Sequence, residues 1–192
     1  ASTGGQLLIL VKGFEEFAAG DGTGSKNNPE AERAPLAIAQ HMFKTLRGSN
    51  NLVFPNSRRE VERYTHLLNG LCEQAQVPNE FWPHHGNLSK EIRYETEAAL
   101  KQREGAATAV CTNTLELGID IGAVKSVVQI GTPPSGASLR QRLGRSGRRE
   151  GEPAILRGYV IEGALDEKVG LETRLRLDTV QTSYLISLLL EN

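Results

Sequence analysis

Short apolar stretches alternate with longer amphipathic stretches along most of this chain. Stretches of about four to eight apolar, often β-branched residues are typical of buried strands, and they predict strands at residues 7–11, 51–54, 81–85, 106–111, 126–130 and 154–161. Strands that alternate with helices predict an α/β fold with a parallel sheet, because each crossover helix returns across one face of the sheet.

Between these predicted strands, apolar residues recur at the spacing of a helix. From Ala31 onward, Leu36, Ala39, Phe43 and Leu46 fall on one stripe, which predicts a helix that buries this stripe. Further helices are expected over residues 58–75 and 90–102, and another near the end of the chain over 184–190.

Polar loops follow four of the predicted strands at the point where each strand ends: PNSRRE, HHGNLS, CTNTLELGID and GTPPSG. The carboxyl ends of parallel strands share one edge of the sheet, and ligands bind at that edge in open α/β folds. Thr112 and Asn113 are candidates to donate to a phosphate, although such residues also form turns. His85, before Gly86, is expected in a loop near a ligand.

Ser57 and Arg58 lie between a predicted strand and the helix that follows it. Ser57 and Glu60 have the spacing of a capping box, so Ser57 either begins the helix or contacts a ligand. Arg58 is the stronger candidate for a phosphate contact, because it stands at a helix N-terminus.

The segment QRLGRSGRRE, residues 141–150, concentrates positive charge in a chain whose net charge is only −1. As a helix it would stack like charges, and each interior glycine would cost about 1 kcal/mol. Such violations of local rules are typical of functional sites. We expect Arg142, Arg145 and Arg148 to project from one side of a turn or helix toward phosphate; the alternative is a solvated basic face, to which Arg149 is assigned.

Asp120 stands between isoleucines in the glycine-flanked segment CTNTLELGIDIG. Its carboxylate either accepts from a ribose hydroxyl or caps the next turn or pairs with an arginine of the basic segment. The residues alone leave these interpretations open.

Several functional classes are disfavoured. Cys72 and Cys111 form no C-x-x-C pair, so reduced, buried thiols are expected and no metal site is predicted. No apolar run approaches the roughly 20 residues of a membrane span, and no basic leader precedes the first apolar run, so a cytoplasmic protein without a membrane role is expected. Ala18–Glu30 is rich in Gly, Asn and Ser and is expected to be a flexible loop.

Together, CTNTLELGIDIG, VVQIGTPPS and QRLGRSGR resemble in order and spacing the second RecA-like lobe of superfamily two, DEAD/DEAH-type helicases. The similarity is greatest to the large helicase-related (Lhr) branch. The resemblance implies a RecA-like three-layer α/β/α sandwich with a mostly parallel central sheet. The domain boundaries expected are a strand and loop over 1–30, the lobe over 31–162 and a helical tail over 163–192.

The resemblance also implies roles for individual residues. Arg145 and Arg148 would be arginine fingers for the γ-phosphate of ATP, which the first lobe of the same polypeptide would hold with Mg²⁺. Gly118 and Asp120 would border the ribose. The arginine motif would be tied to the cleft by Gln141 and Arg142.

The same resemblance implies a track for a single nucleic-acid strand along Ser57, Arg58, the His85–Gly86 loop, Thr112 and Asn113. The branch resembled favours DNA over RNA, and Gln141 replaces the histidine of plain DEAD-box RNA helicases. No phosphate loop and no acidic magnesium motif occur in the sequence. We therefore expect a motor lobe that hydrolyses no ATP by itself; the alternatives are a non-catalytic nucleic-acid-binding module and, less favoured, a small metabolic enzyme.

Overall fold

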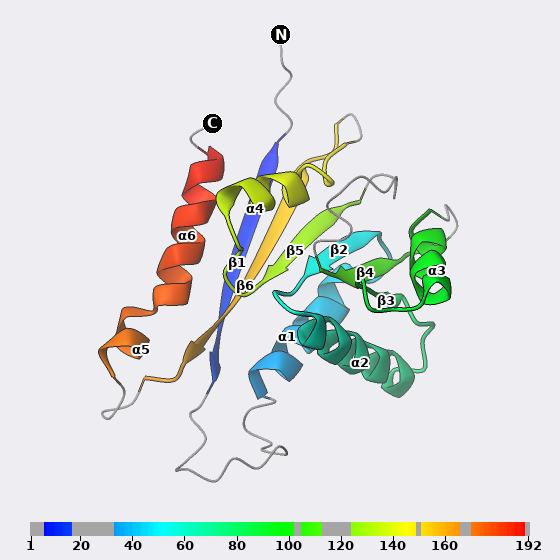
Figure 1. Cartoon of the computed structure of the whole chain (residues 1–192), viewed down its shortest axis with the longest axis horizontal. Coiled ribbons are helices and arrows are strands. Elements are labelled where there is room, and N and C mark those ends of the chain that lie inside the picture. Colours follow the sequence, from blue (N-terminus) through cyan, green and yellow to red (C-terminus); the bar gives the residue numbers. More distant parts are fainter. Residues whose placement is uncertain are drawn as a thin grey trace.

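Six parallel strands form one sheet in the order β1-β6-β5-β2-β4-β3 (Figure 1). The computed structural model describes residues 6–16, 33–101, 105–112, 124–148, 151–165 and 170–190. The strands are β1 (Leu7–Glu16), β2 (Asn51–Phe54), β3 (Phe81–His84), β4 (Thr108–Cys111), β5 (Ser126–Ile130) and β6 (Ala154–Gly163). All six predicted strands form, and β1 and β6 are longer than predicted. The expected burial of the first strand was wrong, because β1 lies at the edge of the sheet with Leu8, Leu10 and Val11 38–49% exposed.

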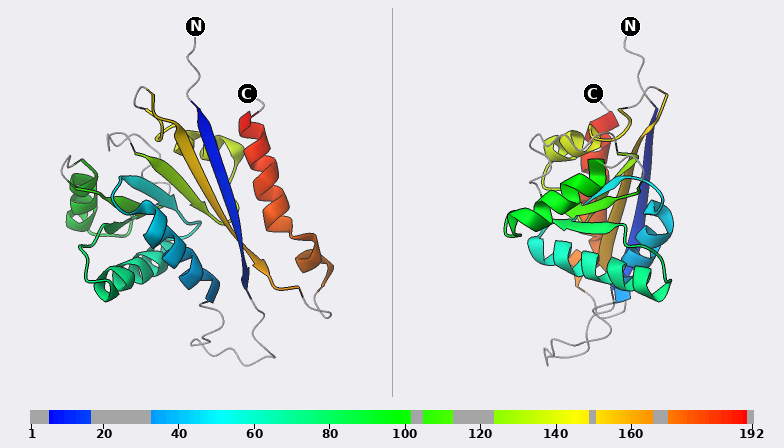
Figure 2. Two further views of the ribbon diagram at one scale, coloured as in Figure 1. Left: turned by 180° about the vertical axis from the view of Figure 1, so that it is seen from behind. Right: turned by 90° about the vertical axis from the view of Figure 1, so that its right-hand side faces the viewer.

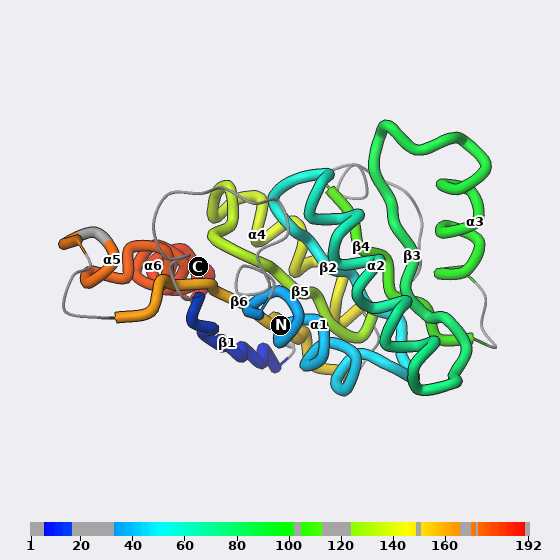
Figure 3. Tube along the Cα trace, turned by 90° about the horizontal axis from the view of Figure 1, so that it is seen from below, coloured from blue at the N-terminus to red at the C-terminus, as the bar shows by residue number. Residues whose placement is uncertain are grey.

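Helices cover both faces of this sheet. They are α1 (Arg33–Leu46), α2 (Arg58–Gln74), α3 (Lys90–Lys101), α4 (Gly136–Leu143), α5 (Leu171–Leu175) and α6 (Leu177–Leu190). In Figure 1 α4 lies in front of the strands, and the view from behind in Figure 2 places α1 on the opposite face. Seen from below, α5 and α6 lie at one end of the molecule and α3 at the other (Figure 3). The predicted three-layer α/β/α architecture is confirmed.

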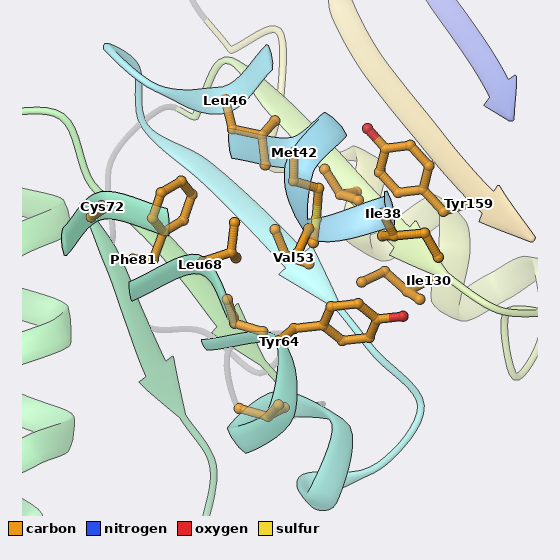
Figure 4. Close-up of a cluster of buried hydrophobic side chains, with 14 residues drawn as sticks. Ile38, Met42, Leu46, Val53, Tyr64, Leu68, Cys72, Phe81, Ile130 and Tyr159 are labelled. Atoms are coloured by element: carbon orange, nitrogen blue, oxygen red, sulfur yellow. The ribbon is translucent and has the colours of Figure 1, made fainter. Parts of the chain in front are cut away.

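One core lies between the sheet and the helices α1 and α2 (Figure 4). Ile38 and Met42 of α1 are fully buried there against Val53 of β2. The predicted stripe on α1 was partly wrong, since Leu36 is 38% exposed. Helical periodicity gives the width of an apolar stripe, but the position of the sheet decides which flank of the stripe is buried.

A second core fills the opposite face of the sheet. Leu52 and Phe54 point to this face, whereas Val53 between them points to α1 and α2. Leu139 of α4 and Ile186 of α6 pack onto the same face. Burial on both faces explains why the central strands are continuously apolar rather than alternating.

The helical tail is anchored at its start by a buried carboxylate. Glu162 of β6 is 6% exposed and accepts from both the amide and the hydroxyl of Thr179 at 2.7 Å. Cys72 and Cys111 are buried free thiols, as predicted. No helix in the described ranges has the length and apolarity needed to cross a membrane. The predicted loop Ala18–Glu30 lies outside the described residues.

Candidate functional site at two edges of the sheet

The loop after β2 begins the carboxyl edge of the sheet. Ser57 is the N-cap of α2, and its hydroxyl accepts from the Glu60 amide at 3.2 Å. Arg58 is the first residue of the helix and its side chain is exposed. The structure thus shows the capping role of Ser57 and leaves Arg58 open to a ligand at this edge.

His84 is the last residue of β3, and His85 begins the loop that follows, as predicted. Both side chains are buried. The His85 side chain packs toward α2, with its Nε2 3.3 Å from Oε1 of Glu62, and the residue is only 2% exposed. Nε2 of His84 lies 3.2 Å from Oε1 of Glu97. Burial lowers the pKa of His84, and the hydrogen bond with Glu97 opposes that shift. A ligand at this loop would meet the exposed Gly86 before either imidazole.

The loops after β3 and β4 are joined by their backbones. The Thr112 amide donates to the carbonyl oxygen of His84 at 3.2 Å, and the Thr112 side chain is half-buried. Thr112 therefore lies beside the His85–Gly86 loop. Asn113, Gly118 and Asp120 lie outside the described residues.

The arginine segment is not one helix. Helix α4 begins after Ser135, whose hydroxyl accepts from the Ser138 amide at 3.1 Å, and it ends at Leu143 with Gly144 as its C-cap. Because the helix ends there, Arg145 and Arg148 lie in the turn that follows and avoid the stacking of like charges that a continuous helix would impose.

This turn lies at the amino edge of the sheet, opposite the polar loops. Ser146 pairs with Val124, which precedes β5, and the Val124 amide donates to the Arg145 carbonyl oxygen at 3.4 Å. Gly147 adopts φ +68°, and a Cβ atom there would lie 2.6 Å from the amide nitrogen of Ala154, the first residue of β6. Glycine is required at this position because another backbone comes so close.

Arg148 and Gln141 are exposed, and Arg145 is partly buried. Nε of Arg148 donates to the Gly144 carbonyl oxygen at 2.9 Å, which fixes the guanidinium base against the end of α4. Planar guanidinium groups held on a short turn can bind phosphate oxygens in pairs. The guanidinium groups of Arg145 and Arg148 are of the kind that binds a polyphosphate.

Arg142 points inward, which corrects the prediction that it projects with Arg145 and Arg148. It is 1% exposed, and its guanidinium donates to Oε1 of Gln129 and lies 4.6 Å from the centroid of the Phe54 ring. These contacts reach from α4 to β5 and β2. Arg142 therefore holds protein elements together rather than facing a ligand.

A hollow of about 440 Å³ opens at the amino edge next to the arginine turn. Its lining includes Asn50, Lys125 and Glu152, and the carbonyl oxygen of Lys125 accepts from the Ser146 hydroxyl at 2.7 Å. Across the part of the chain that the structure describes, no three His, Cys, Asp or Glu side chains converge as a metal site.

Two residues that support the site from outside it, Gln129 and Asn56, were missed by the sequence analysis. Gln129 is buried on β5 between apolar neighbours, and its amide bonds to Asn56 of the loop after β2. A lone amide within the apolar strand SVVQI was the available signal, because a buried amide must find hydrogen-bond partners.

Comparison with known proteins gives a consistent result. The model of the helicase conserved C-terminal domain matches residues 34–150. The Lhr helicase/uracil glycosylase of Escherichia coli is 35% identical over 176 residues, which cover 76% of this chain and 11% of that protein. The ATP-dependent helicase Lhr-Core of Methanothermobacter thermautotrophicus is 36% identical, over 65% of this chain and 15% of that protein.

Among solved structures, the helicase Lhr of Mycobacterium smegmatis bound to ssDNA and AMP-PNP matches with a TM-score of 0.61 and 33% identity, over 81% of this chain and 20% of that chain. Domain 2 of the DEAD-box helicase Mss116p, bound to an RNA duplex, matches with a TM-score of 0.57 and 19% identity. The match covers 82% of this chain and 54% of that chain, and at this identity it shows a similarity of fold alone. The chain thus spans a fifth or less of the Lhr proteins it matches. The predicted RecA-like fold and the predicted resemblance to the Lhr branch are confirmed.

Proposed function

Because the chain belongs to the family of helicase conserved C-terminal domains, we propose that it is the second motor lobe of an Lhr-type, ATP-dependent helicase. In this proposal Arg145 and Arg148 are the arginine fingers for ATP, which with Mg²⁺ is bound mainly by a first lobe. Gly118, Asp120 and Gln141 border the nucleotide, and Arg142 holds the arginine motif in place.

One observation carries this proposal: the arginines proposed to bind ATP and the residues proposed to bind the nucleic-acid strand lie at opposite edges of one sheet. The arginine turn lies beside Val124 at the amino edge, and Arg58 and Thr112 lie at the carboxyl edge. A single basic patch for nucleic acid would gather its arginines on one surface. Separation favours two ligands, one at each edge.

At the carboxyl edge we propose a track for one nucleic-acid strand. Arg58 offers an exposed guanidinium at the start of α2, and the half-buried Thr112 and exposed Gly86 lie on neighbouring loops. Ser57 and Asn113 complete the proposed track, whereas the burial of His85 limits it to support of the loop. DNA is the proposed strand, because the Lhr structure that this chain resembles is bound to ssDNA.

The Arg145→Ala variant of the full-length protein tests the proposal at the amino edge. Arginine fingers are worth about 10³–10⁵ in turnover in other phosphoryl-transfer enzymes, so we expect ATP turnover to fall by at least about 10³. Arg140→Ala is the matched control: it removes the same charge from α4, where Arg140 donates to the Leu188 carbonyl oxygen at 3.1 Å. Equal turnover in wild type and Arg145→Ala would contradict the proposal.

The competing function is a non-catalytic module that uses the arginines on nucleic-acid phosphates. It predicts the opposite result for the same variants: strand binding would fall in Arg145→Ala, and wild-type protein would show no ATP turnover. The distance of the arginine turn from the polar loops disfavours it.

A further inference from the structure

We infer that Gln129 is a positioning residue that couples the strand track to the arginine fingers. It does so through a relay of three side chains, Asn56, Gln129 and Arg142, each from a different segment of the fold. The inference deepens the proposed function and rests on it. It assigns to Asn56 and Gln129 a role in the stimulation of ATP turnover by nucleic acid.

The relay is a continuous chain of hydrogen bonds. The Arg142 guanidinium donates to Oε1 of Gln129, and Nε2 of Gln129 donates to Oδ1 of Asn56 at 3.1 Å. Nδ2 of Asn56 then donates to the Thr132 carbonyl oxygen at 2.8 Å. The relay thus begins at Arg142, shortly before the proposed finger Arg145 in the sequence. It ends at Asn56 and Thr132, in the loops after β2 and β5 at the carboxyl edge.

The direction of every donor in the relay is set by Arg142. A guanidinium can only donate, so the oxygen of the Gln129 amide must face it and the amide NH₂ must face Asn56. The same logic turns the Asn56 oxygen toward Gln129 and its NH₂ toward Thr132. Both amides are therefore held in one orientation, and reversal of either would place two acceptors or two donors against each other.

Burial makes this series of hydrogen bonds rigid at its centre. Gln129 is 2% exposed and Arg142 is 1% exposed, so water does not compete for their bond. Nε2 of Gln129 also donates to the carbonyl oxygens of Ile130 and Gly131, at 3.1 and 3.2 Å, which ties the amide to the end of β5.

At the carboxyl edge the relay ends in close contact with the backbone. Gly131 adopts φ +74°, and a Cβ atom there would lie 2.9 Å from Nδ2 of Asn56. Asn56 directly precedes Ser57 and Arg58, the start of the proposed track. A shift of this loop on strand binding would therefore reach Gln129 and move Arg142 and the end of α4.

Isosteric substitutions break the relay at separate bonds. Gln129→Glu keeps an acceptor for Arg142 but cannot donate to Asn56, and Asn56→Asp keeps an acceptor for Gln129 but cannot donate to Thr132. Gln74→Glu, at the exposed end of α2, is the control for the same chemical change. Asn56 is exposed, so its variant keeps the test usable should the Gln129 variant fail to fold.

The experiment uses the full-length protein and a single-stranded DNA oligonucleotide. Basal ATP turnover, turnover at saturating DNA and DNA affinity are measured for each variant. We expect the DNA-stimulated kcat to fall about 10- to 100-fold in both relay variants, as for small misplacements of catalytic groups. Basal turnover, KM for ATP and DNA affinity should stay within about twofold, and the double variant should lose no more than the more impaired single variant.

Other outcomes overturn the inference. Unchanged stimulation in both variants, an equal fall in basal and stimulated turnover, or losses that multiply in the double variant would each contradict the relay. Failure of the proposed function would be distinguishable, because wild-type protein would then show no DNA-stimulated turnover at all.

Discussion

The guanidinium of Arg142 lies over the ring of Phe54, with its central carbon 4.6 Å from the ring centroid. Phe54 is the last residue of β2 and is fully buried. A desolvated cation–π contact of this kind is worth about 2 kcal/mol. The contact joins the end of the strand that leads into the proposed DNA track to the helix that leads into the proposed fingers.

Arg142→Lys should destabilise the fold by about 2–4 kcal/mol. Lysine keeps the charge but loses the planar group that covers Phe54 and the donor placed on Gln129. Urea unfolding of the 192-residue chain measures this free energy. Arg140→Lys, on the exposed side of the same helix, should change it by less than about 0.5 kcal/mol. Equal stabilities of the two variants would show that Arg142 is not a structural contact.

Gly147→Ala should be far more damaging than Gly144→Ala. Gly147 has φ +68° and no room for a Cβ beside Ala154, so we expect a loss of about 2–4 kcal/mol in unfolding free energy. Gly144 has φ −61° and would place a Cβ at an ordinary 3.5 Å from its neighbours, so alanine there should be neutral to within about 1 kcal/mol. Thermal or urea unfolding compares them, and similar losses would refute the assignment of the close approach.

The fold should lose stability as the pH falls below the ordinary histidine pKa of about 6.5. Burial lowers the pKa of His84, and burial together with the charges of Lys12, Arg157 and Lys44 lowers the pKa of His41. The unfolded chain therefore binds more protons than the folded chain in this window, which disfavours folding as the pH falls.

Urea unfolding at about pH 7.5 and about pH 5.5 checks this sign. Wild-type protein should be less stable at the lower pH, and a variant with His41→Asn and His84→Asn should lose less. If the attraction of Glu97 outweighed the burial of His84, stability would instead rise as the pH falls.

Sequence patterns predicted the central strands β2, β4 and β5 well, because strands buried on both faces are continuous apolar runs. The same pattern did not predict that β1 would be exposed, because its place at the edge of the sheet depends on the topology. They did not predict the inward direction of Arg142, since nothing in its local spacing distinguishes a cation stacked on Phe54 from one in solvent. The burial of His85 likewise depends on its packing against α2. The position of the arginine turn at the amino edge follows from the path of α4 across the sheet, which periodicity does not encode.

The 192-residue chain alone should not hydrolyse ATP. Its sequence contains no phosphate loop and no acidic magnesium motif, so the groups that hold the β- and γ-phosphates would come from another lobe. A coupled assay with and without single-stranded DNA measures this. Turnover that follows this chain through purification and is lost in Arg145→Ala would contradict the expectation.

The central claim is that the arginine turn and the DNA track serve different ligands at opposite edges. The most direct test is the DNA affinity of the full-length protein, without nucleotide, over a range of salt concentrations. Arg58→Ala should weaken binding and reduce the salt dependence by about one phosphate contact, whereas Arg145→Ala should match wild type. Weaker DNA binding in Arg145→Ala than in Arg58→Ala would contradict the account.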